Sequence, residues 1–240
     1  MPQVINFSGA YQLPPQLLGR TSEQRFDYIF EKRIWGHSNG YESVSGSGST
    51  IRYTEIYRDQ LSQYFDTLGE CEFIFFDAPC GDLNWVTKSF RQNMRYVGGD
   101  ISGELIKENQ KKYPDVEMYQ FDICSDTFPK ADIWHCRHCL FHLSLSDIAK
   151  ALENFAMSDL TQALITNHFL PDAVTLDIPT GSFRLLDLTN FPFYLPNPSV
   201  WLLDYDPIKG SQPMATGVWT KDEILHGVRN YHRLWGSDSR

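Results

Sequence analysis

The sequence lacks the features of several large protein classes. Its 240 residues include no apolar run of about 18 residues, the length of a membrane-spanning helix, and no charged-then-apolar signal pattern at the N-terminus. The net charge of −9 argues against a broad nucleic-acid surface, which needs clustered lysine and arginine. Five cysteines without framework spacing suit a reducing compartment. We therefore expect a cytoplasmic protein that binds neither membranes nor nucleic acids.

The stretch from Phe73 to Trp85 predicts a strand, a tight turn and a helix in immediate succession. Phe73 to Asp77 is a short apolar run with three aromatics, typical of a buried strand. A polar turn containing Gly81 follows, and a helix is expected over 84–92 with Asp82 or Asn84 as its cap. This order of elements is how α/β proteins bring backbone N–H groups to a nucleotide at the mouth of a sheet.

Acidic residues end the next two predicted strands. Asp100 follows Asp77 by 100 − 77 = 23 residues, and Asp122 comes directly after the third strand. A carboxylate about 20 residues beyond the glycine turn is where such units hold ribose hydroxyls. Asp122 suits an adenine amino group that lies across the strand ends.

The rest of the chain alternates between strands and helices with short connections. Such alternation predicts a doubly wound parallel α/β sheet, with ligands outside the carboxyl ends of the strands. Two helices are expected before it, with Ser22 as the cap of the first, and a last helix opens with the capping pair Thr220 and Glu223. The expected strands are 72–77, 95–100, 116–121, 131–136, 161–167, 183–188 and 200–205, and the other helices are 22–35, 51–68, 102–113 and 146–157.

The segment Asp77 to Leu83 resembles motif I of the class I S-adenosylmethionine-dependent methyltransferases, Asp/Glu-x-Gly-x-Gly-x-Gly. Gly81 keeps the middle glycine, whereas Pro79 and Leu83 replace the other two. The longer pattern Asp-x-Pro-Cys-Gly-Asp-x-Asn-Trp is similar to a bacterial branch often linked to sugar or polysaccharide modification. Other segments of that branch are present as Trp35-Gly36, Ser45 to Ser49, Arg137 to Ser144, and Asp177 to Leu188 followed by Pro192-Phe193.

The resemblance implies a Rossmann-like methyltransferase fold, with a mostly parallel seven-stranded sheet and an N-terminal helical cap. It divides the chain into an N-terminal arm, helices and lid over 1–68 and a cofactor-binding catalytic domain over 69–240. The implied cofactor is S-adenosylmethionine, and the implied reaction is O-methylation of a small polar acceptor such as a sugar, a nucleotide-linked sugar or a glycan phosphate. Methylation of a natural product or a nitrogen, and a non-catalytic cofactor-binding subunit, stay open as alternatives. The oligomeric state is also open, a homodimer included.

The cofactor site is expected at the strand ends and under the Gly/Ser-rich segment 37–50. Composition alone leaves that segment open as a flexible linker or a lid, and the resemblance favours the lid. A pyrophosphate cofactor is disfavoured because Gly-x-Gly-x-x-Gly is absent and Asp82 would repel it, whereas a sulfonium tolerates that carboxylate. The expected cofactor-binding residues are Trp35, Gly46, Ser49, Asp77, Ala78, Cys80, Gly81, Asp82, Asn84, Trp85, Asp100, Ile101, Asp122, Ile123 and Arg137.

A hydroxyl acceptor benefits from a general base near the strand ends. His142 is the first candidate, with His138 one helical turn before it and Asp177 as a further one; an acceptor that is already an anion needs no base. The plain alternative is that these histidines only pack or bind substrate. The expected substrate-binding residues are Arg184, Phe193 and Tyr194, the last two from the stiff loop 191–198.

The run His135 to His142 has spacing that suggests a metal site, with Cys136 and Cys139 three residues apart. A second pair of ligands is missing from the sequence, and Arg137 would place a positive charge beside a bound cation. We therefore expect no metal and assign the cysteines to the core.

Overall fold

The computed structural model describes residues 11–36, 40, 42–170, 175–204 and 213–235. Within them a seven-stranded sheet has the order β3-β2-β1-β4-β5-β7-β6. The first five strands in the chain are parallel, and β7 is antiparallel to both of its neighbours. This confirms the predicted mostly parallel sheet. The strands are β1 (Phe73–Asp77), β2 (Met94–Asp100), β3 (Glu117–Gln120), β4 (Ile133–Cys136), β5 (Gln162–His168), β6 (Val200–Leu203) and β7 (Met214–Thr220).

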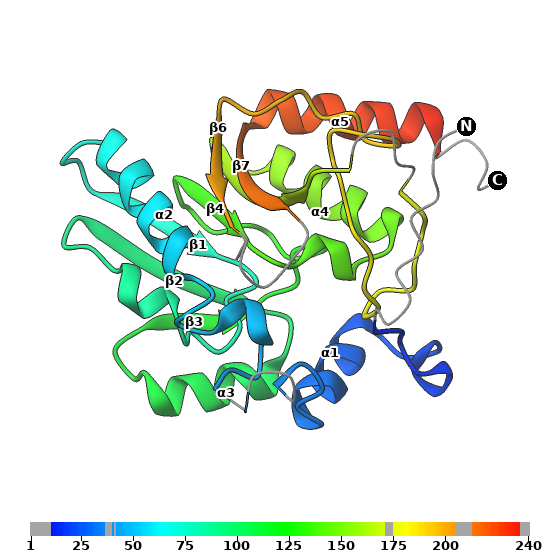
Figure 1. Cartoon of the computed structure of the whole chain (residues 1–240), viewed down its shortest axis with the longest axis horizontal. Coiled ribbons are helices and arrows are strands. Elements are labelled where there is room, and N and C mark those ends of the chain that lie inside the picture. Colours follow the sequence, from blue (N-terminus) through cyan, green and yellow to red (C-terminus); the bar gives the residue numbers. More distant parts are fainter. Residues whose placement is uncertain (1–10, 37–39, 41, 171–174, 205–212, 236–240) are drawn as a thin grey trace.

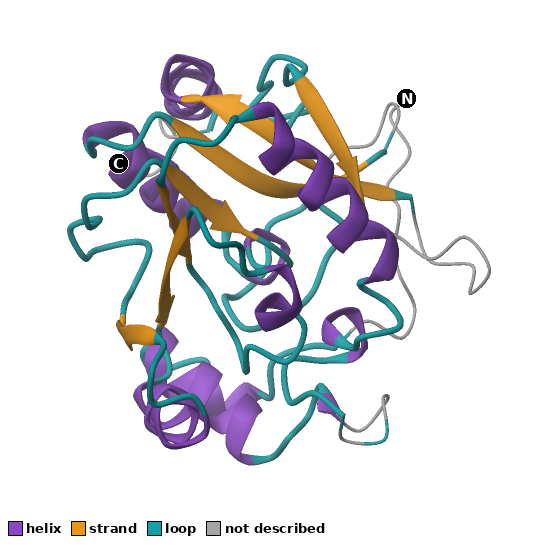
Figure 2. Cartoon of the chain, turned by 90° about the vertical axis from the view of Figure 1, so that its left-hand side faces the viewer, coloured by secondary structure: helices purple, strands orange, loops and turns teal. Residues whose placement is uncertain are grey.

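Helices cover both faces of the sheet (Figures 1 and 2). In Figure 1, α4 and α5 run together on one side, α2 lies on the other, and α1 lies beside α3 at the lower edge. The α-helices are α1 (Ser22–Glu31), α2 (Glu55–Thr67), α3 (Gly103–Lys112), α4 (Leu145–Met157) and α5 (Lys221–Leu234). Short 3-10 turns are η1 (Pro15–Leu17), η3 (Ser47–Ser49), η4 (Val86–Ser89) and η5 (Leu140–His142).

The alternation of side chains along each strand divides the core into two layers. Phe76 and Trp134 pack in the layer under α4 and α5, whereas their neighbours Phe75 and Ile133 pack in the layer under α2. Successive strand residues point to opposite faces, so a sheet covered on both sides needs apolar residues at nearly every position. The continuous apolar run of β1 meets this need and places Asp77 at the carboxyl edge.

Capping residues fix where two of the helices begin. The helix α1 is capped by Thr21 rather than by Ser22, because Gln24 completes a capping box with Thr21. Thr220 and Glu223 form the predicted capping box of α5. Among the described residues, no helix has the length and apolar character needed to span a membrane.

Two predicted elements are wrong. The helix expected over 84–92 is only the 3-10 turn η4, because Gly81 and Leu83 both have positive φ and turn the chain away from a helical path. The strand expected over 183–188 is irregular, and the sequence pattern does not reveal β7, in which Ala215 to Gly217 interrupt the apolar run. The strand β6 lies inside the predicted range 200–205, of which residue 205 is outside the described part.

Candidate functional site

The turn after β1 combines a left-handed backbone with a close approach of another segment. Gly81 has φ of 56° and its carbonyl accepts a hydrogen bond from Asn109 Nδ2 at 2.7 Å. A Cβ atom at Gly81 would lie 2.5 Å from Ser45 Oγ. Only glycine satisfies both conditions without strain, which explains why this one glycine of motif I is present.

Asp100 is buried at the carboxyl end of β2 and faces this turn. Its Oδ2 accepts from the Gly81 N–H at 3.1 Å, and its Oδ1 accepts from the Ser102 N–H at 3.0 Å. Burial raises the pKa of Asp100 to about 6, although the two N–H donors oppose that shift. The carboxylate is therefore short of partners for its charged form, and a ligand that donates to it would stabilise that form.

Asp77, at the end of β1, belongs to a buried chain of polar contacts. Its Oδ1 lies 2.6 Å from His135 Nδ1, and its Oδ2 accepts from Tyr96 Oη at 2.7 Å. The other ring nitrogen of His135 lies 2.8 Å from Tyr57 Oη. Three strands and α2 thus hold the carboxylate in one orientation.

The segment 42–50, which is most of the described part of the Gly/Ser-rich region, lies over the turn after β1. We call it the lid segment. Asp82 Oδ2 accepts from the Val44 N–H at 2.8 Å, and Asn84 Nδ2 donates to Ser49 O at 3.0 Å. These side chains therefore fasten the lid segment instead of capping a helix, and residues 37–39 and 41 of the predicted lid lie outside the described part.

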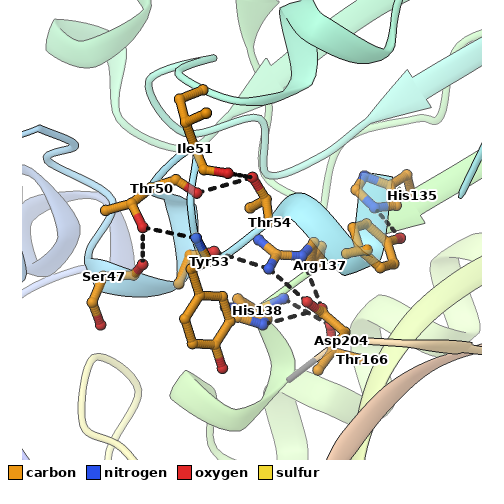
Figure 3. A network of polar contacts seen from close by, with 12 residues as sticks. Ser47, Thr50, Ile51, Tyr53, Thr54, His135, Arg137, His138, Thr166 and Asp204 are labelled. Atoms are coloured by element: carbon orange, nitrogen blue, oxygen red, sulfur yellow. Dashed lines mark hydrogen bonds and ion pairs between the residues drawn. The ribbon is translucent and has the colours of Figure 1, made fainter. Parts of the chain in front are cut away.

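Arg137, just beyond β4, links the lid segment to the far side of the sheet (Figure 3). Its Nε and Nη2 donate to the two carboxylate oxygens of Asp204 at 2.8 and 2.7 Å, and Nη2 also donates to Gly48 O at 2.9 Å. His138 Nε2 lies 3.2 Å from Asp204 Oδ2 but is not aligned as a hydrogen bond. A Cβ atom at Gly48 would lie 2.5 Å from His138 Nδ1, so the lid segment packs closely on that ring.

Two adjoining cavities open at the carboxyl ends of β1, β2 and β4. Both are lined by Phe30, Trp35, Pro79, Asp100 and His138. The first, of about 580 Å³, is an apolar slot between the sheet edge and α1; its further lining residues include Phe26, Ile101, Phe121, Asp122, Ile123, His142 and Leu143. The second, of about 460 Å³, lies under the lid segment; its further lining residues are Ser45, Ser49, Asp77, Cys80, Gly81, Trp85, His135 and Arg137.

The charges that face the cavities are mainly negative. Asp77, Asp100, Asp122 and Asp147 line them, and of these Asp147 is paired with Lys150 at 2.9 Å. Among the described lining residues, Arg137 is the only lysine or arginine, and Asp204 already neutralises it. The arrangement suits a cationic ligand.

Two of the lining histidines are held in their neutral form. His142 Nδ1 lies 2.8 Å from Ser182 O, and because a carbonyl only accepts, Nδ1 carries the hydrogen and Nε2 the lone pair. The ring stacks on Trp35 with centroids 4.5 Å apart, and burial lowers the pKa of His142 to about 3. Burial and the Arg137 charge lower the pKa of His138.

The structure brings most of the predicted cofactor residues to the cavities. Trp35, Ser49, Asp77, Cys80, Gly81, Trp85, Asp100, Ile101, Asp122, Ile123 and Arg137 line one or both. Four others do not line them. Asp82 and Asn84 fasten the lid segment, Gly46 is the N-cap residue before η3, and the Ala78 carbonyl accepts from Trp134 Nε1 in the core.

The predicted substrate residues and Asp177 lie away from both cavities. Asp177 accepts from the Leu145 N–H at the start of α4. Arg184 is 7% exposed and donates to Leu143 O, with Nε and Nη2 unpartnered. Phe193 is fully buried against α5, and Tyr194 is 46% exposed.

Several residues of the site are not singled out by the sequence. Phe26 and Phe30 line the first cavity, whereas their spacing in the sequence indicates only that the helix has an apolar face. Asp204 and Tyr57 reach the site through contacts between distant segments, and no local motif marks them. His135 belongs to a run whose spacing suggests a metal site, and its contact with Asp77 is not evident from the sequence. Among the described residues, no cluster of three or more histidine, cysteine, aspartate or glutamate side chains could hold a metal ion.

The strand order defines a Rossmann-like fold of the class I S-adenosylmethionine-dependent methyltransferase type, with the two cavities at the strand ends. No protein-family model and no curated protein sequence matches the chain. Solved structures do resemble it. The three structures described next share only 10 to 13% sequence identity with this chain, so the likeness establishes the fold alone.

Three of these structures illustrate the likeness. The magnesium protoporphyrin IX methyltransferase of Synechocystis PCC 6803, with bound S-adenosylhomocysteine, has a TM-score of 0.56 and 13% identity over 82% of this chain and 97% of its own. A Burkholderia thailandensis 1,6-didemethyltoxoflavin N1-methyltransferase has a TM-score of 0.57 and 10% sequence identity, and the match covers 83% of this chain and 90% of its own. A Leishmania major S-adenosylmethionine-dependent methyltransferase has a TM-score of 0.59 and 10% sequence identity, and the match covers 86% of this chain and 85% of its own.

Proposed function

We propose that the protein is an S-adenosylmethionine-dependent methyltransferase whose cofactor binds across the two cavities. The observation that supports this most directly is the row of carboxylates at three successive strand ends, Asp77, Asp100 and Asp122, beside an apolar slot. A cofactor with a sulfonium, an ammonium and an adenosine needs this combination of acceptors and apolar surface. The fold is shared with enzymes that bind this cofactor, as the solved structures with S-adenosylhomocysteine illustrate.

Each part of the cofactor has residues of matching chemistry. Asp100 would accept hydrogen bonds from the ribose hydroxyls, and this contact would offset the burial that raises its pKa. Ile101 and Ile123 would pack on the adenine, and Asp122 would accept from its amino group. The methionine part would lie under the lid segment, beside Asp77.

Bound S-adenosylmethionine would supply a methyl group that its positive sulfur already activates. The task of the protein is then to position the acceptor and to exclude water. The lid segment and the aromatic residues of α1 line the cavities and would exclude water from them.

His142 is our first candidate for the base that removes the acceptor proton. Its Nε2 carries the lone pair, and the Ser182 carbonyl and the Trp35 ring fix its orientation. A pKa of about 3 keeps the ring neutral at neutral pH, and the same low pKa makes it a weak base. His138 is the second candidate, because it lines both cavities.

The acceptor that we propose is a small polar molecule with a hydroxyl group, such as a sugar, on the strength of the sequence resemblance. The charge of the cavities favours an uncharged sugar over a glycan phosphate. The summed negative charge of Asp77, Asp100 and Asp122 exceeds the single net positive charge that a bound cofactor adds. A phosphate would therefore meet net repulsion. Arg184, one of the expected substrate-binding residues, does not line either cavity.

The test is methyl transfer from S-adenosylmethionine, followed as formation of S-adenosylhomocysteine. We would compare neutral sugars and nucleotide-free glycosides with the phosphate esters of the same sugars. Turnover with neutral members is the expected result. Turnover with phosphate esters alone would refute the charge argument. Cofactor binding with no turnover on any acceptor in this set would favour a non-catalytic subunit or a different acceptor class.

A further inference from the structure

Two aromatic rings that contact each other and two hydrogen-bond acceptors hold the guanidinium of Arg137. Its carbon lies 4.9 Å from the centroid of the Tyr57 ring and 5.0 Å from that of Trp85, within the range of cation–π contact. Asp204 accepts from Nε and Nη2, and Gly48 O accepts from Nη2.

The contacts leave one nitrogen of Arg137 for another partner. A guanidinium carries five N–H groups, one on Nε and two on each Nη. Within the described part of the chain, Asp204 and Gly48 accept from the one on Nε and from both on Nη2, which leaves the two on Nη1. Arg137 lines the second cavity together with Asp77 and Gly81. The N–H groups of Nη1 can donate a charge-assisted hydrogen bond to a carboxylate in that cavity.

Asp204 is what holds this arrangement. It is 1% exposed at the end of β6, and its carboxylate contacts Arg137 and His138. Burial alone would raise the pKa of Asp204, but the Arg137 charge and His138 hold it well below its usual range. A buried carboxylate is costly unless a cation pairs with it, so its place beside Arg137 is a specific feature of the site.

We propose that Asp204 is a positioning residue that orients Arg137 so that Nη1 binds the carboxylate of the cofactor's methionine part. This inference rests on the proposed function, because it takes the occupant of the second cavity to be S-adenosylmethionine. Arg137 Nη2 also donates to Gly48 O, so the same side chain ties the lid segment to the bound carboxylate. Asp204 itself needs no contact with the cofactor.

The test compares S-adenosylmethionine with decarboxylated S-adenosylmethionine, which lacks only the carboxylate, by calorimetry on the full chain. The wild type should prefer the carboxylated ligand by roughly tenfold to a hundredfold, the value of one charge-assisted hydrogen bond. In Asp204→Asn that preference should nearly vanish, while the affinity for the decarboxylated ligand stays close to the wild-type value. A purely structural role would weaken both ligands equally and leave the preference unchanged.

Two further variants guard against a folding defect. The double variant Arg137→Met with Asp204→Leu removes both charges together, so that neither is left buried alone, and it should lose the same preference. Asp187→Asn is the matched control, because Asp187 is also a buried carboxylate with several hydrogen bonds but lies outside the cavities. It should keep the preference whatever happens to its stability.

The outcomes separate this inference from the proposed function. Equal affinity of the wild type for the two ligands, or an unchanged preference in Asp204→Asn, would overturn the role of Asp204 and Arg137 while leaving the cofactor assignment intact. Failure of the folded wild type to bind either ligand would refute the cofactor assignment itself.

Discussion

Lowering the pH from about 7 to about 5 should weaken the binding of S-adenosylhomocysteine by about tenfold, because the ribose must donate to an ionised Asp100. Burial raises the pKa of this carboxyl group to about 6. Its ionised fraction then falls from about 0.9 at pH 7 to about 0.09 at pH 5, and the apparent affinity falls in proportion.

The stability of the ligand-free protein should respond to this group in the opposite direction. The pKa of Asp100 rises from 3.8 to about 6, so the folded state binds this proton more tightly than the unfolded state. The stability that it contributes is therefore present at low pH and is lost as the pH rises through about 6, by about 3 kcal/mol. Ligand binding and this contribution to stability thus have pH dependences of opposite sign.

Calorimetric titrations of S-adenosylhomocysteine at half-unit steps of pH would measure the first effect. The variant Asp100→Asn should bind at least tenfold more weakly and lose the pH dependence. Burial lowers the pKa values of His142 and His168 to about 3 and about 4, so these histidines titrate below the range of interest. A dissociation constant that stays level from pH 7 to pH 5 would refute the assignment of Asp100 to the ribose.

Three other substitutions test separate parts of the site. Gly81→Ala should weaken S-adenosylhomocysteine binding at least tenfold. Gly69 has φ of 77° and open space around it, so Gly69→Ala should bind the ligand normally although its backbone penalty, roughly 1 kcal/mol, is similar. Equal binding by the two variants would refute the steric argument. Asp82→Ala should release the lid segment and speed dissociation of S-adenosylhomocysteine about tenfold in stopped-flow measurements, and an unchanged rate would contradict a lid role. His142→Ala should reduce turnover about a hundredfold with little change in cofactor affinity, and normal turnover would exclude it as the base.

The parallel part of the fold could be predicted because its signals are local. The apolar run before Asp77 and the acids at Asp100 and Asp122 mark strands and their carboxyl ends within a few residues of sequence. Capping is local as well, and Thr220 with Glu223 predicts the start of α5 correctly. These features depend on period and spacing, which a single sequence carries.

The remainder depends on contacts between distant segments. The strand β7 contains Ala215, Thr216 and Gly217, and it forms because β5 and β6 offer hydrogen bonds on both sides. The segment 183–188 has a stronger strand pattern, but it lies beside the end of β5 with its carbonyl at Leu186 bonded to the His168 N–H, outside a ladder. Local propensity cannot decide between these outcomes.

The site shows the same division. Asp82 and Asn84 have the residue types of helix caps, and sequence alone does not show that the lid segment takes up their hydrogen bonds. Asp204 lies 67 residues after Arg137 in the chain, with no motif around it, and only the sheet order brings the two together. Predictions of residue type at strand ends therefore succeed where predictions of pairing fail.

The most direct test of the cofactor assignment is a calorimetric titration of the purified wild-type protein with S-adenosylmethionine and with S-adenosylhomocysteine, at a pH of about 7.5, where Asp100 is ionised. We expect saturable binding of both ligands with one site per chain. Absence of binding by both, in a sample whose folding is verified by a cooperative thermal transition, would contradict the proposal that the strand-end cavities hold this cofactor.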